Sequence, residues 1–563
     1  MSPASPPGPA TDGLRLRPDP GLRSLDGGTV LLGGSPYRLL RLGPAGARHV
    51  AGWWDGEPVA GTPGAQALAR RLLWAGIAHP VPAGGPGPED VTVVIPVRDR
   101  TAELALCLAG LGEYRVIVVD DGSRDPAAVA ALAAAAGARC VHRAVNGGPA
   151  AARNTGLAAV GTPLAAFLDS DCVPAPGWLS PLLPHFADPA VAAVAPRIVP
   201  HAPAPVPAGA AADAARAAGP GGSAGWLARY EGFSSTLDMG AVPSIVRPGA
   251  KVAYVPGAAL VVRAAAAGDG FAEHMPLGED VDFVWRLAAA GWHVRYEPAA
   301  TVAHQHRVRL RGWFTRRMQY GTSAAPLELR HPGTLPAVAM SGWSAAAWAA
   351  AALGHPGAGA GITAAATALL ARRLAPVTGD PWPVAARLAA GGTVAAGRLL
   401  GSTLSRAWWP VALPAAIAVP RLRLPLAALV LAPPVLGWRE RRPPMDPARY
   451  VSARLLDDVA YSIGVWQGCL RHRTARPLLP RLTWRAGRGP HGAGRGWARL
   501  RRAGAGRRSR PAPARPGSRH RRALVARGWP CGAGLASQLS LASRAVADGE
   551  PRPVQASQPG PAE

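Results

Sequence analysis

Three clusters of acidic residues contain the side chains best suited to chemistry. They are Asp120-Asp121, Asp169-Ser170-Asp171 and Glu279-Asp280. Carboxylates accept hydrogen bonds from ribose hydroxyls, hold hard divalent cations and remove protons from hydroxyl groups. Each cluster taken alone also fits a turn or a helix cap, so the elements around it decide its interpretation.

The first cluster follows the apolar run 115–119. A carboxylate just beyond a buried strand can accept hydrogen bonds from a ribose hydroxyl or a base N–H, while Gly122 lets the backbone turn sharply toward a ligand. The alternative is an Asp-Gly turn at a strand end that binds nothing. Asp120 and Asp121 are therefore candidate nucleotide-binding residues.

The second cluster follows the strand-like segment 165–168. Asp169 and Asp171 can jointly hold a divalent cation, Mn²⁺ or Mg²⁺, which bridges phosphate oxygens and neutralises charge on a departing diphosphate. A neutral imidazole at His304 is predicted to complete the shell of the cation beside Asp171. The alternatives are a surface turn and a histidine that is merely satisfied by hydrogen bonds.

The third cluster opens a stretch with helical spacing, 283–290. Acidic residues in a first turn are favoured by the helix dipole, so capping is one interpretation of Glu279 and Asp280. A carboxylate at a helix start beside a metal-diphosphate site is also well placed to remove a proton from an acceptor hydroxyl, and we predict that Asp280 is this general base. Arg153, after the loop 146–149, is predicted to pair with a phosphate, with a helix-capping loop as the alternative.

The elements that must position these clusters alternate between strand and helix. The strand-like runs 91–95, 115–119 and 165–168 are separated by helical stretches at 104–111 and 127–136. This order is typical of an α/β fold with a parallel sheet, in which ligands bind at the carboxyl ends of the strands. The first strand is not followed by GxGxxG or GxxxxGK[ST], which argues against a Rossmann dehydrogenase or a P-loop NTPase.

The composition of the chain limits the number of domains and the kinds of partner that can be inferred. The 563 residues suffice for two to four domains, and 61 basic minus 34 acidic residues give a net charge of +27. Lys251 is the only lysine, so a bias toward Arg, Ala, Gly and Pro accounts for much of this charge and names no partner. Five cysteines without close pairing indicate a reducing cytosol, and the N-terminus does not resemble a secretory signal.

The chain divides into six predicted segments. They are a disordered start (1–13), a small domain of strands and helices (14–82), a linker (83–90), the catalytic domain (91–326), a helical region (327–484) and a disordered Arg-rich tail (485–563). The tail lacks an aromatic stacking platform, so we predict no nucleic-acid partner.

The helical region contains uncharged stretches. Residues 331–371 include no Asp, Glu, Lys or Arg, and arginines flank the shorter apolar run 424–438. We expect membrane-embedded or membrane-surface segments here, facing an anionic inner leaflet, which places the protein at the cytoplasmic face of the cell membrane. The alternative is a soluble helical domain in the cytoplasm.

The joint order of these features resembles the family-2 glycosyltransferases over about residues 90–310. The resemblance implies an α/β fold of the GT-A type, a nucleotide-sugar-binding mixed sheet with flanking helices. It also implies direct displacement at the anomeric carbon with inversion, with Asp280 as base, and a metal bound by Asp171 and His304. The residues implied to bind the donor nucleotide are Pro96, Arg98, Asp120, Asp121, Arg153 and Asp169. Glu279 and Gly257 are implied to lie on the acceptor side.

The segments VVIPVRDR (93–100), FLDSDCVPAPGWL (167–179) and RRMQYGTSAAPL (316–327) narrow this resemblance to the mycofactocin system glycosyltransferases. The segment from Leu25 to Trp53 is similar to winged-helix domains that recognise leader peptides by adding a strand to a sheet edge. This implies that glucose passes from UDP-glucose to a peptide-derived redox cofactor or its precursor.

Several other functions remain as alternatives. A membrane-associated family-2 enzyme could act on a cell-envelope polysaccharide or a lipid. A sugar nucleotidyltransferase would share the nucleotide site but normally has a basic glycine-rich loop, which this chain lacks. A binding module without catalytic activity is the third alternative.

Overall fold

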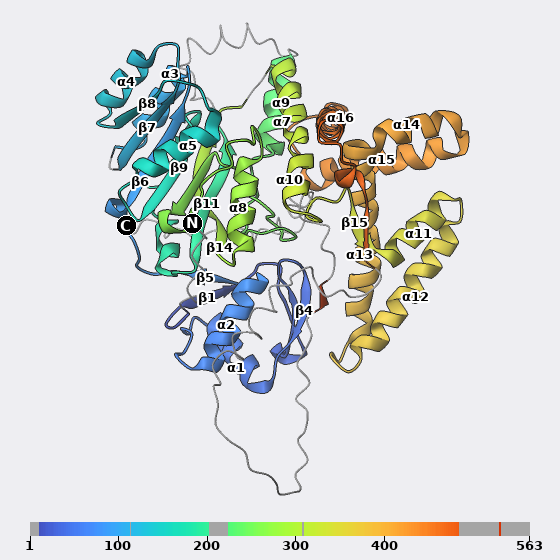
Figure 1. Ribbon diagram of the computed structural model, residues 1–563. Coiled ribbons are helices and arrows are strands. Elements are labelled where there is room, and N and C mark those ends of the chain that lie inside the picture. The colour runs from blue at the N-terminus through green and yellow to red at the C-terminus, as the bar shows by residue number, and fades with distance from the viewer. Residues whose placement is uncertain (1–10, 113, 202–222, 307–308, 484–528, 531–563) are drawn as a thin grey trace, which may run out of the picture.

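The computed structural model describes residues 11–112, 114–201, 223–306, 309–483 and 529–530. The predicted disordered segments therefore lie almost wholly outside the described residues. Within the described ranges the chain forms an N-terminal unit, a large mixed sheet with helices, and a C-terminal helical region (Figure 1).

The N-terminal unit packs two small sheets against two helices. Leu31, Leu40 and Trp53 are buried together with the apolar face of the second helix. A three-stranded antiparallel sheet extends from one strand to the next through tight turns, and β17 joins it at the free edge of β4. Its elements are β1 (Arg15–Pro18), β2 (Arg23–Leu25), β3 (Val30–Gly33), β4 (Arg38–Arg41), α1 (Pro44–Trp54), α2 (Pro63–Ala75), β5 (Ala78–Val81) and β17 (Trp529–Pro530).

The central sheet has the strand order β10-β14-β11-β13-β9-β6-β7-β8, with β12 paired to β14. Strands β9, β6, β7 and β8 are parallel to their neighbours in that run, whereas β13 is antiparallel to β9 and β11. This is the mixed α/β sheet predicted from the sequence. The strands are β6 (Val91–Val97), β7 (Arg115–Asp121), β8 (Arg139–Arg143), β9 (Leu164–Leu168), β10 (Cys172–Pro174), β11 (Val191–Pro200), β12 (Ser244–Ile245), β13 (Ala259–Arg263) and β14 (His293–His304).

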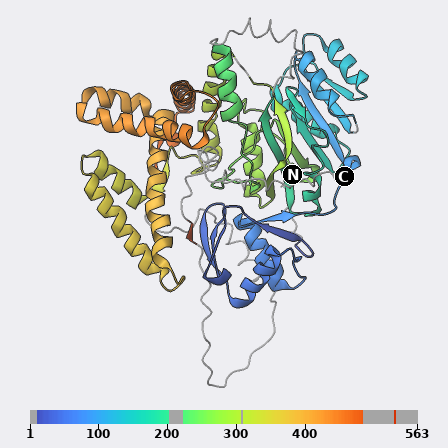
Figure 2. The same ribbon diagram turned by 180° about the vertical axis from the view of Figure 1, so that it is seen from behind.

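Helices cover both faces of this sheet because its strands are apolar on both sides. One face is buried by α3 (Thr101–Ala109) and α4 (Pro126–Ala135). The other is buried by α5 (Gly148–Ala159) and α8 (Glu279–Ala289). Figure 2 shows the same sheet from behind. The carboxyl ends of β6, β7 and β9 consequently reach one edge, where α5 and α8 begin.

The helical region wraps from the sheet to the N-terminal unit. Its elements are α9 (Leu310–Thr322), α10 (Ala324–Arg330), β15 (Ala339–Ser341), α11 (Gly342–Ala352), α12 (Pro356–Leu374), α13 (Pro381–Thr403), the π-helical turn η5 (Leu404–Trp408), α14 (Trp409–Ala418), α15 (Arg423–Arg441), α16 (Pro447–Arg471) and β16 (Arg481–Thr483), with α7 (Ser223–Ser234) beside α9. In the part of the chain that the structure describes, none of the helices combines the length and apolar character needed to span a bilayer.

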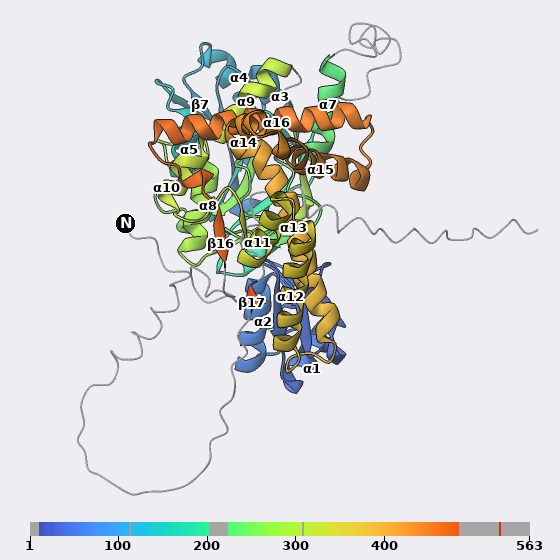
Figure 3. The ribbon, with the colours of Figure 1, turned by 90° about the vertical axis from the view of Figure 1, so that its right-hand side faces the viewer.

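The N-terminal unit is held by contacts on two sides. The outer face of its sheet, with Val30, Leu32 and Leu39, packs against apolar residues of α12 and α13, which lie beside it in Figure 3. On the other side Arg247, after β12, donates hydrogen bonds to the carbonyl oxygens of Ser35 (3.1 Å) and Trp74 (2.8 Å). The three parts of the chain thus form a continuous packed structure.

Glycines allow α16 to pack unusually close to α9. A Cβ atom added at Gly464 would lie 1.8 Å from the carbonyl oxygen of Met318, and one at Gly321 would lie 2.1 Å from that of Tyr461. Because the obstructing atoms belong to the backbone, a side chain at either position forces the two helices apart.

We therefore expect Gly464→Ala to lower the free energy of unfolding by about 2 kcal/mol or more, through overpacking between α9 and α16. Gly312→Ala is the matched control, because Gly312 also lies in α9 and a Cβ there meets nothing within 4 Å. Thermal unfolding of both variants tests this, and an unchanged melting temperature for Gly464→Ala would contradict the close packing.

Candidate active site

A cavity of about 610 Å³ lies at the edge where β6, β7 and β9 end. Ten of the eleven residues singled out in the sequence line it. They are Pro96, Arg98, Asp121, Arg153, Asp169, Asp171, Gly257, Glu279, Asp280 and His304. Asp120 is the exception. The fold thus gathers residues that are up to 208 positions apart in the chain, from Pro96 to His304, around one space.

The two aspartates that end β7 have different surroundings. Asp121 accepts hydrogen bonds from the backbone N–H groups of Gly147 (2.9 Å) and Gly148 (2.8 Å), and so fixes the glycine loop before α5. Asp120 is fully buried behind the cavity, where it accepts from the N–H of Ser123 (3.0 Å) and lies 2.8 Å from His142 Nδ1. Asp121 thus borders the cavity, while Asp120 shapes the turn that follows β7.

Arg153 is the buried link between two acidic clusters. Its Nη2 donates to Asp169 Oδ1 (2.7 Å) at the end of β9, and its Nη1 donates to Glu279 Oε1 (2.8 Å) at the start of α8. Although burial disfavours its charge, the carboxylates of Asp169 and Glu279 hold the pKa of Arg153 above its usual value. The guanidinium is therefore a permanent cation whose two terminal nitrogens already bind carboxylates.

Asp171 and His304 face each other across two paired strands. The register places Cys172 opposite His304, which brings Asp171 Oδ1 to 3.5 Å from His304 Nε2. Burial lowers the pKa of His304, so its imidazole is neutral near pH 7, and its Nδ1 has no hydrogen-bond partner among the described residues. Arg100 forms an ion pair with Asp171 from the loop after β6.

Asp171 and His304 form a pair of side chains with the chemistry of metal ligands. No group of three or more His, Cys, Asp or Glu side chains is arranged around a common point in the described ranges. Asp171 and His304 nevertheless supply one carboxylate and one neutral imidazole side by side, a donor pair suited to Mn²⁺ or Mg²⁺ when diphosphate oxygens provide further ligands. The residues present fit a cation bound together with its substrate.

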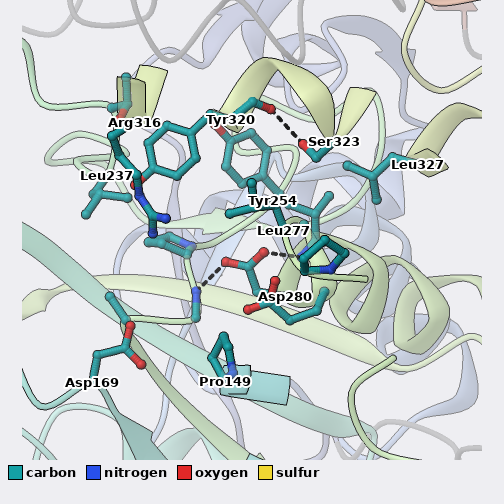
Figure 4. A pocket seen from close by; sticks show the side chains of 18 of the residues that line it. Pro149, Asp169, Leu237, Tyr254, Leu277, Asp280, Arg316, Tyr320, Ser323 and Leu327 are labelled. Carbon is teal, nitrogen blue, oxygen red and sulfur yellow. Dashed lines mark hydrogen bonds between the residues drawn. The ribbon is translucent and has the colours of Figure 1, made fainter. Parts of the chain in front are cut away.

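Asp280 lies where α8 begins. Gly278 precedes the helix in a left-handed conformation (φ 81°), and a Cβ there would come within 3.1 Å of Ser323 and Leu327, so the turn requires glycine. The Asp280 carboxylate accepts from the N–H groups of Gly257 (2.7 Å) and Val281 (2.8 Å). Figure 4 shows it projecting into the cavity between Asp169 and Tyr254. This carboxylate is fixed by backbone donors and open to a ligand.

The side of the cavity beyond Asp280 contains residues that sequence reasoning missed. Arg316 and Tyr320 come from α9, and Tyr254 from the loop before β13. Arg406 and Tyr461 come from η5 and α16. The segment 316–327 stands out in the sequence only as a family pattern. Nothing near Arg406 or Tyr461 in the sequence indicates that they approach the cavity of Asp280, which lies 126 and 181 residues earlier in the chain.

Comparisons with known proteins agree with this site. The sequence pattern of Glycosyl transferase family 2 matches residues 92–211, which contain the ends of β6, β7 and β9. The fold and the site thus define a family-2 glycosyltransferase, and the alternatives of a nucleotidyltransferase and a binding module receive no support.

The chain belongs to the pre-mycofactocin glycosyltransferases. It is 41% identical over 491 residues to the pre-mycofactocin glycosyltransferase of Mycobacterium tuberculosis, in strains CDC 1551 / Oshkosh and ATCC 25618 / H37Rv alike, covering 84% of this chain and 98% of that protein. The predicted family and the GT-A type of fold are confirmed.

Two more distant similarities were found. Succinoglycan biosynthesis protein ExoU of Rhizobium meliloti (strain 1021) is 39% identical over 103 residues, which cover 17% of this chain and 30% of that protein. The structure of mannosyltransferase PcManGT from Pyrobaculum calidifontis, in complex with GDP-Man and Mn²⁺, is 17% identical, with a TM-score of 0.36, and the match covers 69% of this chain and 90% of that one.

The charge of Glu279 gives the site a predicted pH dependence. Burial and the neighbouring Asp280 carboxylate raise the pKa of Glu279 to about 7, against the opposing effect of Arg153. As the pH falls from 8 to 6, Glu279 takes up a proton and a negative charge disappears beside the cavity. We therefore expect a nucleotide-sugar diphosphate to bind several-fold more tightly at pH 6 than at pH 8.

The Glu279→Gln variant should bind the donor equally tightly at pH 6 and pH 8, with the affinity that the wild type shows at pH 6. Calorimetric titration with UDP-glucose at fixed Mg²⁺ measures this. Glu89→Gln, which removes an exposed carboxylate just before β6 and far from the cavity lining, should keep the pH dependence of the wild type. Equal donor affinity for the wild type at pH 6 and pH 8 would rule out this role for Glu279.

Proposed function

We propose that the enzyme transfers glucose, with inversion, from UDP-glucose to pre-mycofactocin, a peptide-derived redox cofactor precursor, with Asp280 as the general base. The observation that supports the proposal most strongly is the common cavity. Asp280, in the first turn of α8, lines this cavity together with residues at the carboxyl ends of β7 and β9. The names of the related proteins support pre-mycofactocin as the acceptor.

The donor side of the cavity suits a nucleoside diphosphate. Arg98 is about half exposed after β6, and the loop fixed by Asp121 places Asn146, Gly148 and Pro149 along the cavity. Pro96 ends the strand beside them. A base and ribose are thus expected between β6 and this glycine loop, with the diphosphate extending toward Asp169 and Asp171.

Asp171 and His304 are the residues that would hold a divalent metal. A bound Mn²⁺ or Mg²⁺ would offset the negative charge of the diphosphate leaving group. Arg100, paired with Asp171, orients this carboxylate, and the neutral His304 leaves its nitrogen lone pair available for coordination at pH 7. Arg153 adds a fixed positive charge beside Asp169.

The reaction follows from one positioned carboxylate. An acceptor hydroxyl oxygen forms a bond to the anomeric carbon, the bond from that carbon to the diphosphate oxygen breaks, and Asp280 takes the hydroxyl proton. Hydrogen bonds from Gly257 and Val281 hold the carboxylate in place during this step. Because the displacement is single, the configuration at the anomeric carbon inverts.

The N-terminal unit offers a way to recognise a peptide. The edge of β4 opposite β3 is paired antiparallel with a segment from elsewhere in the chain, in which Trp529 lies beside Leu39 and Pro530 beside Arg38. An extended segment therefore fits this edge by strand addition. The unit packs against α12 and α13 and, through Arg247, against the catalytic domain.

The base assignment predicts that Asp280→Asn keeps donor binding and lowers kcat by about 100-fold or more, since the amide cannot take the proton. Titration with UDP-glucose and Mn²⁺, combined with product detection by mass spectrometry, measures both quantities. Asp171→Ala is the complementary variant, and it should lose the metal-dependent part of donor binding. Unchanged turnover in Asp280→Asn would remove Asp280 from this role, and product on a polysaccharide or lipid but none on pre-mycofactocin would overturn the proposed acceptor.

The hairpin of α14 and α15 supports the proposed location at the cytoplasmic face of the cell membrane. It projects from the body of the molecule in Figure 1, and α14 contains no buried residue. Large apolar side chains are exposed on it, among them Ile417 (66%) and Leu424 (80%). Arginines lie at its turn and its far end, at 421, 423, 439, 441 and 442. An apolar surface bordered by cations matches an anionic lipid surface.

We expect the full-length enzyme to co-sediment with vesicles that contain phosphatidylglycerol and to bind pure phosphatidylcholine vesicles weakly. The double variant Ile417→Asp, Leu424→Asp should lose vesicle binding and keep its activity in solution. Leu470→Asp, at an equally exposed position of α16 (74%), should bind like the wild type. Retained sedimentation of the double variant would show that the hairpin is not the docking element.

A further inference from the structure

We propose that the C-terminal helical region completes the acceptor subsite, and that Tyr461 and Arg406 determine the specificity of the enzyme for its acceptor. The proposal rests on the proposed function, because it assigns the second substrate of the same reaction to one wall of the cavity. That wall is formed by Tyr254, Tyr320, Tyr461 and Arg406. We call these four residues the tyrosine wall.

The tyrosine wall and the residues expected to bind the donor lie on opposite sides of Asp280. In Figure 4 Asp169 and Pro149 lie on one side of the Asp280 carboxylate, and Tyr254 and Tyr320 lie on the other. The donor diphosphate belongs with the first pair at the carboxyl edge of the sheet. A general base must touch the hydroxyl that attacks, so the acceptor occupies the side on which the tyrosines lie.

Tyr254 is held rigidly on this side. The indole Nε1 of Trp285 donates to the carbonyl oxygen of Ala253 (2.7 Å), and Gly257 N donates to Asp280 (2.7 Å), so both ends of the short loop around Tyr254 are attached to α8. Burial and the nearby Tyr461 raise the pKa of Tyr254 to about 12, which keeps its hydroxyl protonated at neutral pH. Tyr254 therefore presents a fixed ring and a hydrogen-bond donor.

Arg406 lies in the π-helical turn η5, an irregularity that often marks functional positions. Its guanidinium stacks over the ring of Tyr461, 4.3 Å from the ring centre, and its Nη1 donates to Asp458 (3.2 Å). Trp466 of α16 donates to the carbonyl oxygen of Ala407 (2.7 Å), which ties the turn to the helix that carries Tyr461. The turn and α16 present the stacked pair as one unit.

A buried charge network fixes this unit against the catalytic domain. Arg317 of α9 pairs with Glu231 of α7 and, through Nε, with Asp457 of α16 (3.0 Å). Asp457 also accepts from the hydroxyl of Tyr230 (3.2 Å). Separating any of these buried partners would leave a charge unpaired, which costs free energy. The network therefore holds α16 at a fixed position relative to the cavity. The tyrosine wall is thus preorganised.

The chemistry of the wall indicates a ligand whose ring has an apolar face. Three aromatic rings with apolar neighbours at Leu277 and Leu335 favour stacking contacts. Asp457, a carboxylate of α16 that also lines the cavity, is already engaged by Arg317 and Tyr230. The acceptor is therefore expected to place one ring face against the tyrosines and one hydroxyl at Asp280. A phenolic ring and a pyranose ring both have such a face.

Steady-state kinetics with UDP-glucose and pre-mycofactocin test the proposal. Tyr461→Ala should raise the KM for pre-mycofactocin roughly tenfold or more, because a stacked ring is lost. The KM for UDP-glucose should stay near the wild-type value. Tyr461→Phe, which keeps the ring, should restore most of the acceptor affinity, and Leu456→Ala, on the exposed surface of α16, is the control.

Arg406→Lys provides a second variant if Tyr461→Ala is unstable, and it should raise the KM for the acceptor alone. Monoglucosylated pre-mycofactocin and unmodified pre-mycofactocin, compared as acceptors, distinguish a pyranose ring on the wall from a ring of the unglycosylated acceptor. Equal changes in donor and acceptor KM, or no change in either, would overturn the proposal. Absence of glucosyl transfer to pre-mycofactocin by the wild type would instead contradict the proposed function.

Discussion

The Arg153 guanidinium bridge between Asp169 and Glu279 is the interaction on which the rest of the site depends. It joins the end of β9 to the start of α8 inside the protein, with hydrogen bonds of 2.7 and 2.8 Å. Asp280, one residue after Glu279, is thereby held at a fixed position relative to the strand that leads to Asp171. Without this cation three carboxylates would repel one another in a buried space, and the helix start would move away from the sheet.

The elements that surround this bridge could largely be predicted from the sequence. Apolar β-branched runs at 91–95 and 115–119 form strands because both of their faces are buried, and the acidic residues that follow them reach the carboxyl edge by the geometry of parallel strands. The same logic brings Asp121, Asp169, Asp171, Asp280 and His304 to one cavity. It cannot distinguish Asp121, which borders the cavity, from Asp120, which is buried and does not line it. Adjacent residues of a strand point to opposite faces, and which of the two faces the cavity depends on the register of the sheet.

The far wall of the cavity could not be predicted, for physical reasons that lie in tertiary packing. The approach of α16 to α9 depends on backbone contacts at Gly321, Gly464 and Gly468, and no local periodicity of the sequence encodes them. Arg406 and Tyr461 reach the cavity only through that packing. The apolar segments of the helical region are similarly ambiguous, because Ala-rich helices that pack on α13 and on the N-terminal unit have nearly the composition of membrane segments.

The most direct test of the account is the configuration of the first sugar that the enzyme attaches. In the proposed donor, UDP-glucose, the glucose is α-linked, and a single displacement assisted by the proposed base Asp280 predicts a β-linked product. Proton NMR of the purified product measures this through the coupling of its anomeric proton. A large axial–axial coupling, typical of the β-anomer, is the predicted result, and the small coupling of an α-linked product would contradict direct displacement assisted by Asp280.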